Sequence, residues 1–211
     1  MNKIQSKVLA CFIGFAILSI FNINNSFALE KGGVFVEPMV TWERGTGHID
    51  FPAPINTSDS KIRGFGVGAR LGVHIFETIF IAADARYSIP KLKDSTLNQD
   101  IKSKSYNIGP TVGVQMPWIV GLRAWAGYIL GGVLDPDSDK GVDEKFKSGN
   151  GWRIGAGLKF AIASFNIEYQ DIKYDETDIS QVGIFTPGFT SNNIQLRNKS
   201  MILSVSFPFS L

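Results

Sequence analysis

The clearest pattern in the chain is a strict alternation of apolar residues with glycine and charged residues over residues 62–75. Every second position from Phe65 to Ile75 is apolar, and the positions between them are glycine, arginine or histidine. Side chains of a β-strand point alternately to its two faces, so the pattern predicts a strand with one wholly apolar face. A face of glycine and charge fits the crowded interior of a small barrel, where small residues leave room for large ones.

The same alternation recurs along the chain and predicts eight strands. Their expected bounds are 33–43, 62–75, 79–87, 105–116, 122–131, 152–160, 165–170 and 201–211. The end of the seventh strand is left open, because the alternation blurs over residues 171–175. Polar segments predicted as long loops (45–61, 88–104, 133–150 and 171–199) alternate with short turns.

These lengths and connections favour a barrel in a bacterial outer membrane. A tilted strand needs about 9–11 residues to cross the bilayer. Outer-membrane barrels have short periplasmic turns and longer extracellular loops. Aromatic rings prefer the headgroup level, and they fall near both predicted interfaces. Those expected toward the loops are Trp42, Tyr87, Tyr106 and Trp152, and those toward the turns are Trp118, Phe160, Phe165 and Phe209.

The first 28 residues have the pattern of a secretory signal peptide. Lys3 and Lys7 form a basic region, residues 8–21 are apolar, and Ser26-Phe27-Ala28 is a small-x-small cleavage site. We therefore expect a signal peptide over residues 1–28 and one barrel domain over residues 29–211.

Charge and cysteine content narrow the function classes. Removing Lys3 and Lys7 leaves 19 of the 21 basic residues against 19 acidic ones, so the mature chain is formally neutral. This balance gives no support to a nucleic-acid partner. The single cysteine, Cys11, lies in the signal peptide, which excludes disulfides, cysteine catalysis and thiolate metal sites in the mature chain.

The signal peptide, the eight alternating strands and the C-terminal alternation together resemble the small outer-membrane barrels of the OmpA/OmpX type. The resemblance implies an all-β, eight-stranded, antiparallel, up-and-down transmembrane β-barrel, made with the help of the barrel-assembly machinery. It also implies an assembly signal in the last strand, which in the family usually ends in an aromatic residue, whereas here the last residue is leucine. The corresponding positions are Leu203, Val205, Phe207, Phe209 and Leu211.

Eight charged residues are expected to point into the barrel and to form one connected network. A charge buried without a partner costs several kcal/mol, so the members should pair with one another. A turn at residues 76–78 places Arg70 opposite Asp84, and a turn centred on Ile119 places Trp125 opposite Gly113. Basic members outnumber acidic ones five to three, so any leak should favour anions. The eight are Glu37, Arg70, Asp84, Arg86, Arg123, Arg153, Lys159 and Glu168.

Three functions remain open. The first is a non-enzymatic envelope protein that contacts outer-membrane lipid and meets a surface ligand or protein through its four loops. The second is a narrow ion or small-solute channel through the charged interior, and the third is a soluble barrel with an apolar interior that binds a ligand. No enzyme is expected, because the only histidines are His48, among ordinary loop residues, and His74, which has no serine beside it.

Two loop features bear on partners. Apolar residues in predicted loops could cap the barrel mouth or form a contact patch; they are Phe51, Ile55, Ile184, Phe185 and Phe189. The acidic loop over residues 135–144 departs from the EF-hand pattern, with Lys140 in place of the glycine and Phe146 in place of the closing glutamate. A solvated loop is expected there rather than a calcium site, and neither a metal nor a cofactor is predicted.

Overall fold

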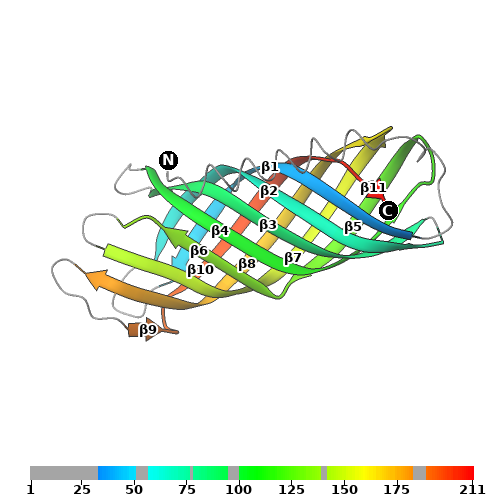
Figure 1. Ribbon diagram of the computed structural model, residues 1–211. Helices are drawn as coiled ribbons and strands as arrows, with labels where there is room; N and C mark the ends of the chain where they lie inside the picture. The colour runs from blue at the N-terminus through cyan, green and yellow to red at the C-terminus, as the bar shows by residue number, and fades with distance from the viewer. Residues whose placement is uncertain (1–32, 51–56, 77, 95–99, 139–141, 183–188) are drawn as a thin grey trace, which may run out of the picture.

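The computed structural model describes residues 33–50, 57–76, 78–94, 100–138, 142–182 and 189–211. Tilted antiparallel strands wrap around a long central axis (Figure 1). In chain order they are β1 (Gly33–Asp50), β2 (Ser58–Ile75), β3 (Ile79–Asp94), β4 (Asp100–Gln115), β5 (Val120–Ile129), β6 (Gly131–Pro136), β7 (Val142–Phe160), β8 (Ala163–Val182), β9 (Phe189–Ser191), β10 (Gln195–Ser206) and β11 (Phe209–Ser210).

These elements make a ring of eight strands, as the sequence predicted. The pieces β5 and β6 share one position in the ring, because both pair with β4 and β7, and the short β11 follows β10 along β1. The ring closes between β1 and β10. Partner residues traced across the strands run from Gly33 through His74, Phe80, Gly113, Trp125, Gly155, Glu168 and Ile202 to Glu43. The trace returns to β1 ten residues beyond its start, which is the stagger that tilted strands of a closed barrel require.

Most strands are longer than the sequence predicted. β8 runs for 20 residues and β1 for 18, against the expected 9–11. Much of each expected long loop is therefore strand, including 45–50, 88–94 and 171–182. The extensions all lie at one end of the barrel, and β11 with the C-terminus lies at the other (Figure 1).

The half of the barrel nearest the C-terminus is apolar outside, and its interior is mainly polar, with one buried apolar cluster of Phe35, Phe80, Ala82 and Trp125. Phe65 is 70% exposed on the outer surface, whereas Arg70 is fully buried within the barrel. This arrangement excludes the soluble barrel with an apolar interior, because such a protein would have the two faces exchanged. Among the described residues, no helix has the length and apolar character needed to span a membrane.

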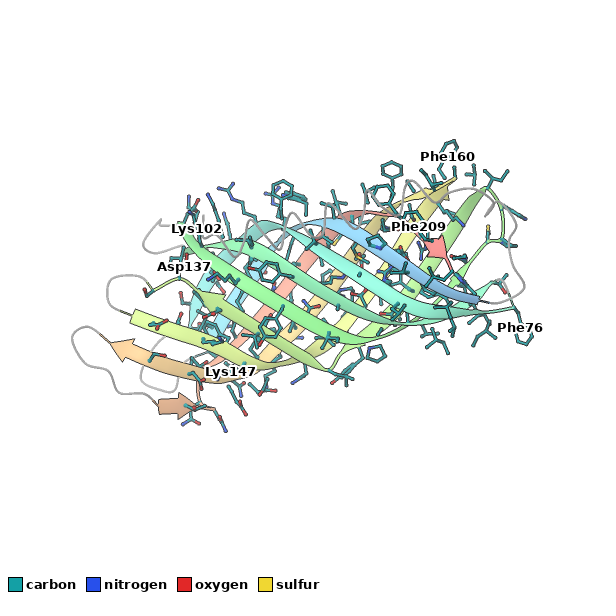
Figure 2. All side chains as sticks on the ribbon, viewed as in Figure 1. Phe76, Lys102, Asp137, Lys147, Phe160 and Phe209 are labelled. Carbon is teal, nitrogen blue, oxygen red and sulfur yellow. The ribbon has the colours of Figure 1, made fainter. Side chains whose placement is uncertain are left out.

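A belt of aromatic side chains around the barrel, which we call the aromatic ring, marks the limit of this apolar surface toward the strand extensions. Trp42 is opposite Phe65, Tyr87 is opposite Tyr106, and Tyr128 is opposite Trp152. Tyr169 lies against Trp152, with ring centroids 5.3 Å apart. Seven strands of the ring thus contribute an aromatic residue at one level, as expected for the boundary between lipid and water. Phe76 and Phe160 lie toward the other end (Figure 2).

Beyond the aromatic ring the strands keep their alternation but exchange the polarity of their faces. Ile172 and Tyr174 are buried inside while Lys173 between them is exposed, and Leu196 is buried while Arg197 is exposed. The inward residues form an apolar core within the extended barrel. Its buried members are Ile62, Leu92, Ile129, Leu134, Phe146, Ile172, Tyr174 and Leu196.

The predicted assembly segment forms the closing seam with β1. Leu203 is exposed on the outer surface and pairs with Trp42. The strand is interrupted at Pro208, but Phe207 N–H donates to the Pro38 carbonyl and Leu211 N–H to the Val34 carbonyl. Pro38 therefore lies where the seam is irregular, which is where a strand tolerates proline.

Candidate functional site

The membrane-spanning part of the barrel is filled by ion pairs. At the level nearest the turns, both terminal nitrogens of Arg123 donate hydrogen bonds to the Glu37 carboxylate, at 2.7 and 2.8 Å. The Ser206 hydroxyl donates to the same carboxylate. The guanidinium of Arg123 also lies 5.4 Å from the ring centre of Trp125. Because these contacts are bidentate and closed off from water, they fix the side chains rather than leave them free to move.

A second cluster of charged side chains lies next to the first, on the side farther from the turns. Asp84 accepts hydrogen bonds from Arg70 Nε at 2.8 Å, Arg86 Nε at 2.8 Å and Arg153 Nη1 at 3.3 Å. Glu168 accepts from Arg86 Nη2 at 2.7 Å. Arg70 is directly opposite Asp84 across β2 and β3, as predicted from the turn.

Aromatic packing supports this cluster. The guanidinium of Arg70 stacks 4.4 Å from the ring centre of Trp125, and the indole N–H donates to Glu168 at 3.3 Å. Trp125 has Gly113 opposite on one side and Gly155 on the other. A Cβ at Gly155 would lie 2.5 Å from the indole, so the ring occupies the space that glycine leaves.

Glu43 belongs to the interior as well, although the sequence analysis did not include it. Its carboxylate accepts from Gln170 at 2.9 Å, Asn198 at 3.0 Å and Ser200 at 2.7 Å. The alternation along residues 35–43 already placed Glu43 on the inward face, but it stood at the expected strand end. With Glu43 counted, the buried interior holds four acidic residues (Glu37, Glu43, Asp84 and Glu168) and four arginines (Arg70, Arg86, Arg123 and Arg153).

This count differs from the expected five basic and three acidic residues. Lys159, the fifth basic residue in that expectation, is only partly buried and has no ion pair among the described residues. It lies near the turn end, opposite Gly121. The fully buried charges of the described barrel are therefore balanced, and Lys159 is a fifth basic residue at their edge.

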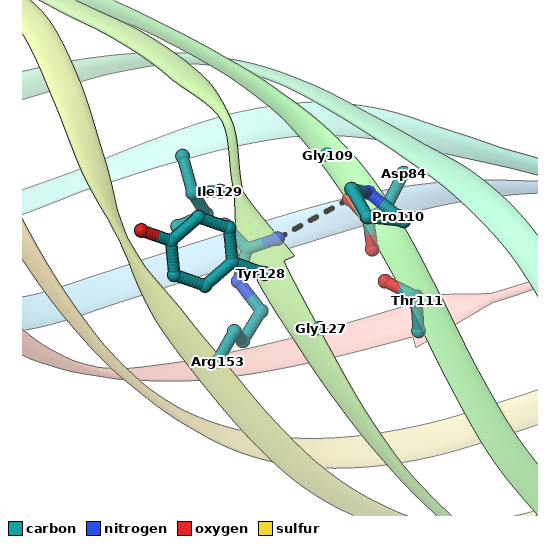
Figure 3. Close-up of a pocket in the computed structure, with 8 residues that line it drawn as sticks. All are labelled: Asp84, Gly109, Pro110, Thr111, Gly127, Tyr128, Ile129 and Arg153. Atoms are coloured by element: carbon teal, nitrogen blue, oxygen red, sulfur yellow. Dashed lines mark hydrogen bonds and ion pairs between the residues drawn. The ribbon is translucent and has the colours of Figure 1, made fainter.

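Little free space remains around the network. Where β5 gives way to β6, the wall residues Gly109, Pro110 and Gly127 surround the Asp84–Arg153 contact (Figure 3). The gap among these residues has no room for a water molecule. Above the network, the apolar core closes the extended barrel a second time.

His48 is the histidine outside the membrane, and it lies on β1 near the loop end. Its Nδ1 donates to Asp59 at 2.6 Å, and its Nε2 lies 3.3 Å from Asp50. The hydrogen bond to Asp59 raises the pKa of His48 above its ordinary value. The nearby Ser60 hydroxyl donates to the Gly47 carbonyl instead, so no described hydroxyl is paired with His48. The described residues also contain no cluster of three acidic, histidine or cysteine side chains placed to hold a metal ion.

The expected loop patch cannot be assembled from the described residues. Phe51, Ile55, Ile184 and Phe185 lie outside them, and only the backbone of Phe189 is described, at the start of β9. Part of the acidic loop, residues 139–141, also lies outside. Its flanks are described, and there Asp135 pairs with Lys145 at 3.3 Å rather than facing other carboxylates.

Comparison with known proteins identifies the family. The description "Outer membrane protein beta-barrel domain" fits residues 13–209, which is nearly the whole chain. The chain belongs to this family. It is therefore a bacterial outer-membrane β-barrel, in agreement with its apolar outer surface and aromatic ring. No curated protein matches the sequence.

Three solved structures of outer-membrane proteins are similar to this chain, and one of them supports the fold. The crystal structure of the outer membrane protein OprG from Pseudomonas aeruginosa is 12% identical, with a TM-score of 0.55, and the match covers 86% of this chain and 98% of OprG. Neisserial surface protein A (NspA) is 16% identical, with a TM-score of 0.44, over 85% of this chain and 100% of NspA. The outer membrane protease OmpT from Escherichia coli is 9% identical, with a TM-score of 0.45, over 90% and 99%. The likeness to OprG supports the fold alone, and the other two TM-scores are too low to carry an argument.

Proposed function

We propose that this family member is a non-enzymatic envelope protein with a closed interior, which acts through its outer surface and its loops. The observation that carries the proposal is the filled barrel. The bidentate Arg123–Glu37 pair and the Asp84–Glu168 cluster fill the section within the membrane. An apolar core fills the section beyond it. A path for ions would have to open both.

The absence of an enzyme activity is part of the proposal. Acyl-transfer and hydrolytic sites need a nucleophile within hydrogen-bond reach of its base. His48 has carboxylates on both ring nitrogens, and Ser60 is committed to a backbone carbonyl. The arrangement therefore supports an exposed ion pair that ties β1 to β2 rather than a reactive centre.

Planar-bilayer recording of the refolded mature protein tests the closed interior. We expect no conductance above the lipid baseline, because neutral, mutually paired side chains leave no continuous water. An open porin reconstituted in the same lipid is the positive control. Discrete single-channel steps from the wild-type protein would favour the narrow channel instead.

A further inference from the structure

A row of four basic residues crosses the outer surface of β1–β4 just beyond the aromatic ring. Arg44 is directly opposite Arg63, Arg63 is opposite Lys91, and Lys91 is opposite Lys102. We call these four residues the basic row. All four side chains are exposed, and Lys61 lies one outward position farther along β2.

The basic row places like charges side by side. Residues directly opposite on antiparallel strands have Cβ atoms about 4.5–5.5 Å apart, and like charges at that spacing destabilise the pair. Among the described residues, the one acidic side chain in an ion pair with the row is Asp100, 3.4 Å from Arg63. The row therefore carries an excess of positive charge that the described residues do not neutralise.

The rest of the same rim is built differently. On β7, β8 and β10 three exposed or partly exposed basic residues have acidic partners of their own: Lys173 pairs with Asp175 at 2.8 Å, Arg197 pairs with Asp171 at 2.7 Å, and Lys147 pairs with Asp178. Among the described residues, Lys199 on β10, next to β1, has no such partner. Lys102 and Lys147 lie toward the same end of the barrel, at opposite edges of the view in Figure 2. The basic residues without an acidic partner among the described residues are thus concentrated on the β1–β4 side of the barrel.

The level of the row indicates what neutralises it. Arg44 is two residues beyond Trp42, and Arg63 is two residues before Phe65, so the row begins one outward position past the aromatic ring. Aromatic rings of this kind lie at the headgroup level. The charged groups of these four side chains therefore lie at the level of the phosphate groups of outer-leaflet lipids. Arginine and lysine are well suited to bind phosphate.

We propose that the basic row binds the phosphate groups of an anionic glycolipid or phospholipid in the outer leaflet, on the β1–β4 side of the barrel. The lipid supplies the negative charge that these four strands lack, while its acyl chains lie against the apolar wall below. The binding site is on the outside of the barrel, so the proposal does not depend on whether the interior conducts.

The test uses the full mature protein, refolded in zwitterionic detergent, with a matched pair of variants. In the row variant, Arg44→Gln, Arg63→Gln, Lys91→Gln and Lys102→Gln are combined. In the control variant, four substitutions on β7, β8 and β10 remove the same number of basic residues, each of which has an acidic partner: Lys145→Gln, Lys147→Gln, Lys173→Gln and Arg197→Gln. The unboiled gel mobility of each variant shows that it is folded before any lipid is added.

The probe is bisphosphorylated lipid A, titrated against each folded protein and compared with the same lipid after enzymatic removal of its phosphates. We expect the row variant to bind the phosphorylated lipid about tenfold more weakly or worse, because each basic residue near an anionic surface contributes to binding. The control variant should change less than about twofold. The dephosphorylated lipid should bind all three proteins equally weakly.

Three results would overturn the proposal. One is an equal loss of binding in the row and control variants, which would indicate a general effect of net charge. Another is undiminished binding of the dephosphorylated lipid. The third is competition by inorganic pyrophosphate at concentrations equal to those of the lipid, which would assign the row to a free anion and not to a membrane lipid.

Discussion

Asp84 is the residue on which the largest number of interior charges depend. It accepts hydrogen bonds from Arg70, Arg86 and Arg153. Its neutralisation leaves these three buried arginines with Glu168 and, for Arg70 at 3.6 Å, Glu37 as their close carboxylates. Breaking a buried ion pair costs about 3–5 kcal/mol. We expect Asp84→Asn to lower the free energy of unfolding by about that amount, measured by urea unfolding in phosphatidylcholine vesicles.

Asp175→Asn is the matched control for Asp84→Asn. It removes a carboxylate that pairs with Lys173 on the exposed rim, where water screens the interaction. Its free energy of unfolding should stay close to that of the wild type. Equal effects of the two substitutions would show that the interior pairs are solvated and would contradict the closed interior.

His48 gives the molecule a titratable contact outside the membrane. Because the hydrogen bond to Asp59 raises its pKa, the folded state holds the proton more tightly than the unfolded state. The resulting stabilisation is present below the ordinary pKa of 6.5 and is lost as the pH rises through the raised value. An NMR titration should place the His48 pKa above 6.5 in the wild type and closer to 6.5 in Asp59→Asn. An identical pKa in both proteins would contradict the assigned hydrogen bond.

At the residue scale, the sequence predicted which residues face each other across neighbouring strands, but it did not predict the number of acidic residues in the interior. Turn positions fixed the register, so Arg70 opposite Asp84 and Trp125 opposite Gly113 could be predicted. Glu43 is not among the predicted interior charges because it is the last residue of the predicted strand. Its neighbour Arg44 begins the polar outer surface of the extension. The contacts that join the network, such as Arg123 with Glu37, cross the interior between strands distant in sequence and have no local signal.

At the scale of the strands, the extensions behave as a water-soluble sheet with an apolar core. Phe146 is fully buried in that core, opposite Leu134, and the partly exposed Lys145 and Lys147 flank it. We expect Phe146→Ala to destabilise the extension by about 3–5 kcal/mol. Trypsin should then cleave at the flanking lysines of the variant while leaving the wild type intact, since proteases act on locally opened backbone.

The membrane-spanning part supplies the internal control for Phe146→Ala. Its stability comes from contacts elsewhere, so the unboiled gel mobility of the cleaved variant should still show a folded barrel. Equal trypsin sensitivity of the wild type would mean that the extension is open without any substitution.

The sequence predicted the number and order of strands in the ring but not their length. The prediction ends the third strand at Tyr87 and leaves the end of the seventh open over residues 171–175. The alternation itself continues there, with Leu92 and Ile172 inward, but the two faces have exchanged polarity. Alternation with a period of two indicates a strand. Which of its two faces is apolar indicates whether lipid or water surrounds it, and only the first of these signals determines where the strand ends.

At the scale of the whole molecule, the two fillings of the barrel act in series. The ion-pair network closes the section within the membrane, and the apolar core closes the section beyond it. Opening one leaves the other in place. We therefore expect Asp84→Asn and Phe146→Ala each to stay at the lipid baseline in bilayer recordings. Conductance from either single variant would show that one filling alone seals the protein.

The length of the strands also determines where this protein can meet other molecules. β1 continues for eight residues past Trp42, which at about 3.3 Å per residue and a tilt of about 40° raises its end by about 20 Å. The described end of β1 thus lies well clear of the headgroups. A large partner such as an antibody would reach the ends of the extended strands without approaching the bilayer, whereas the outer sides of these strands stay within reach of lipids and their sugars.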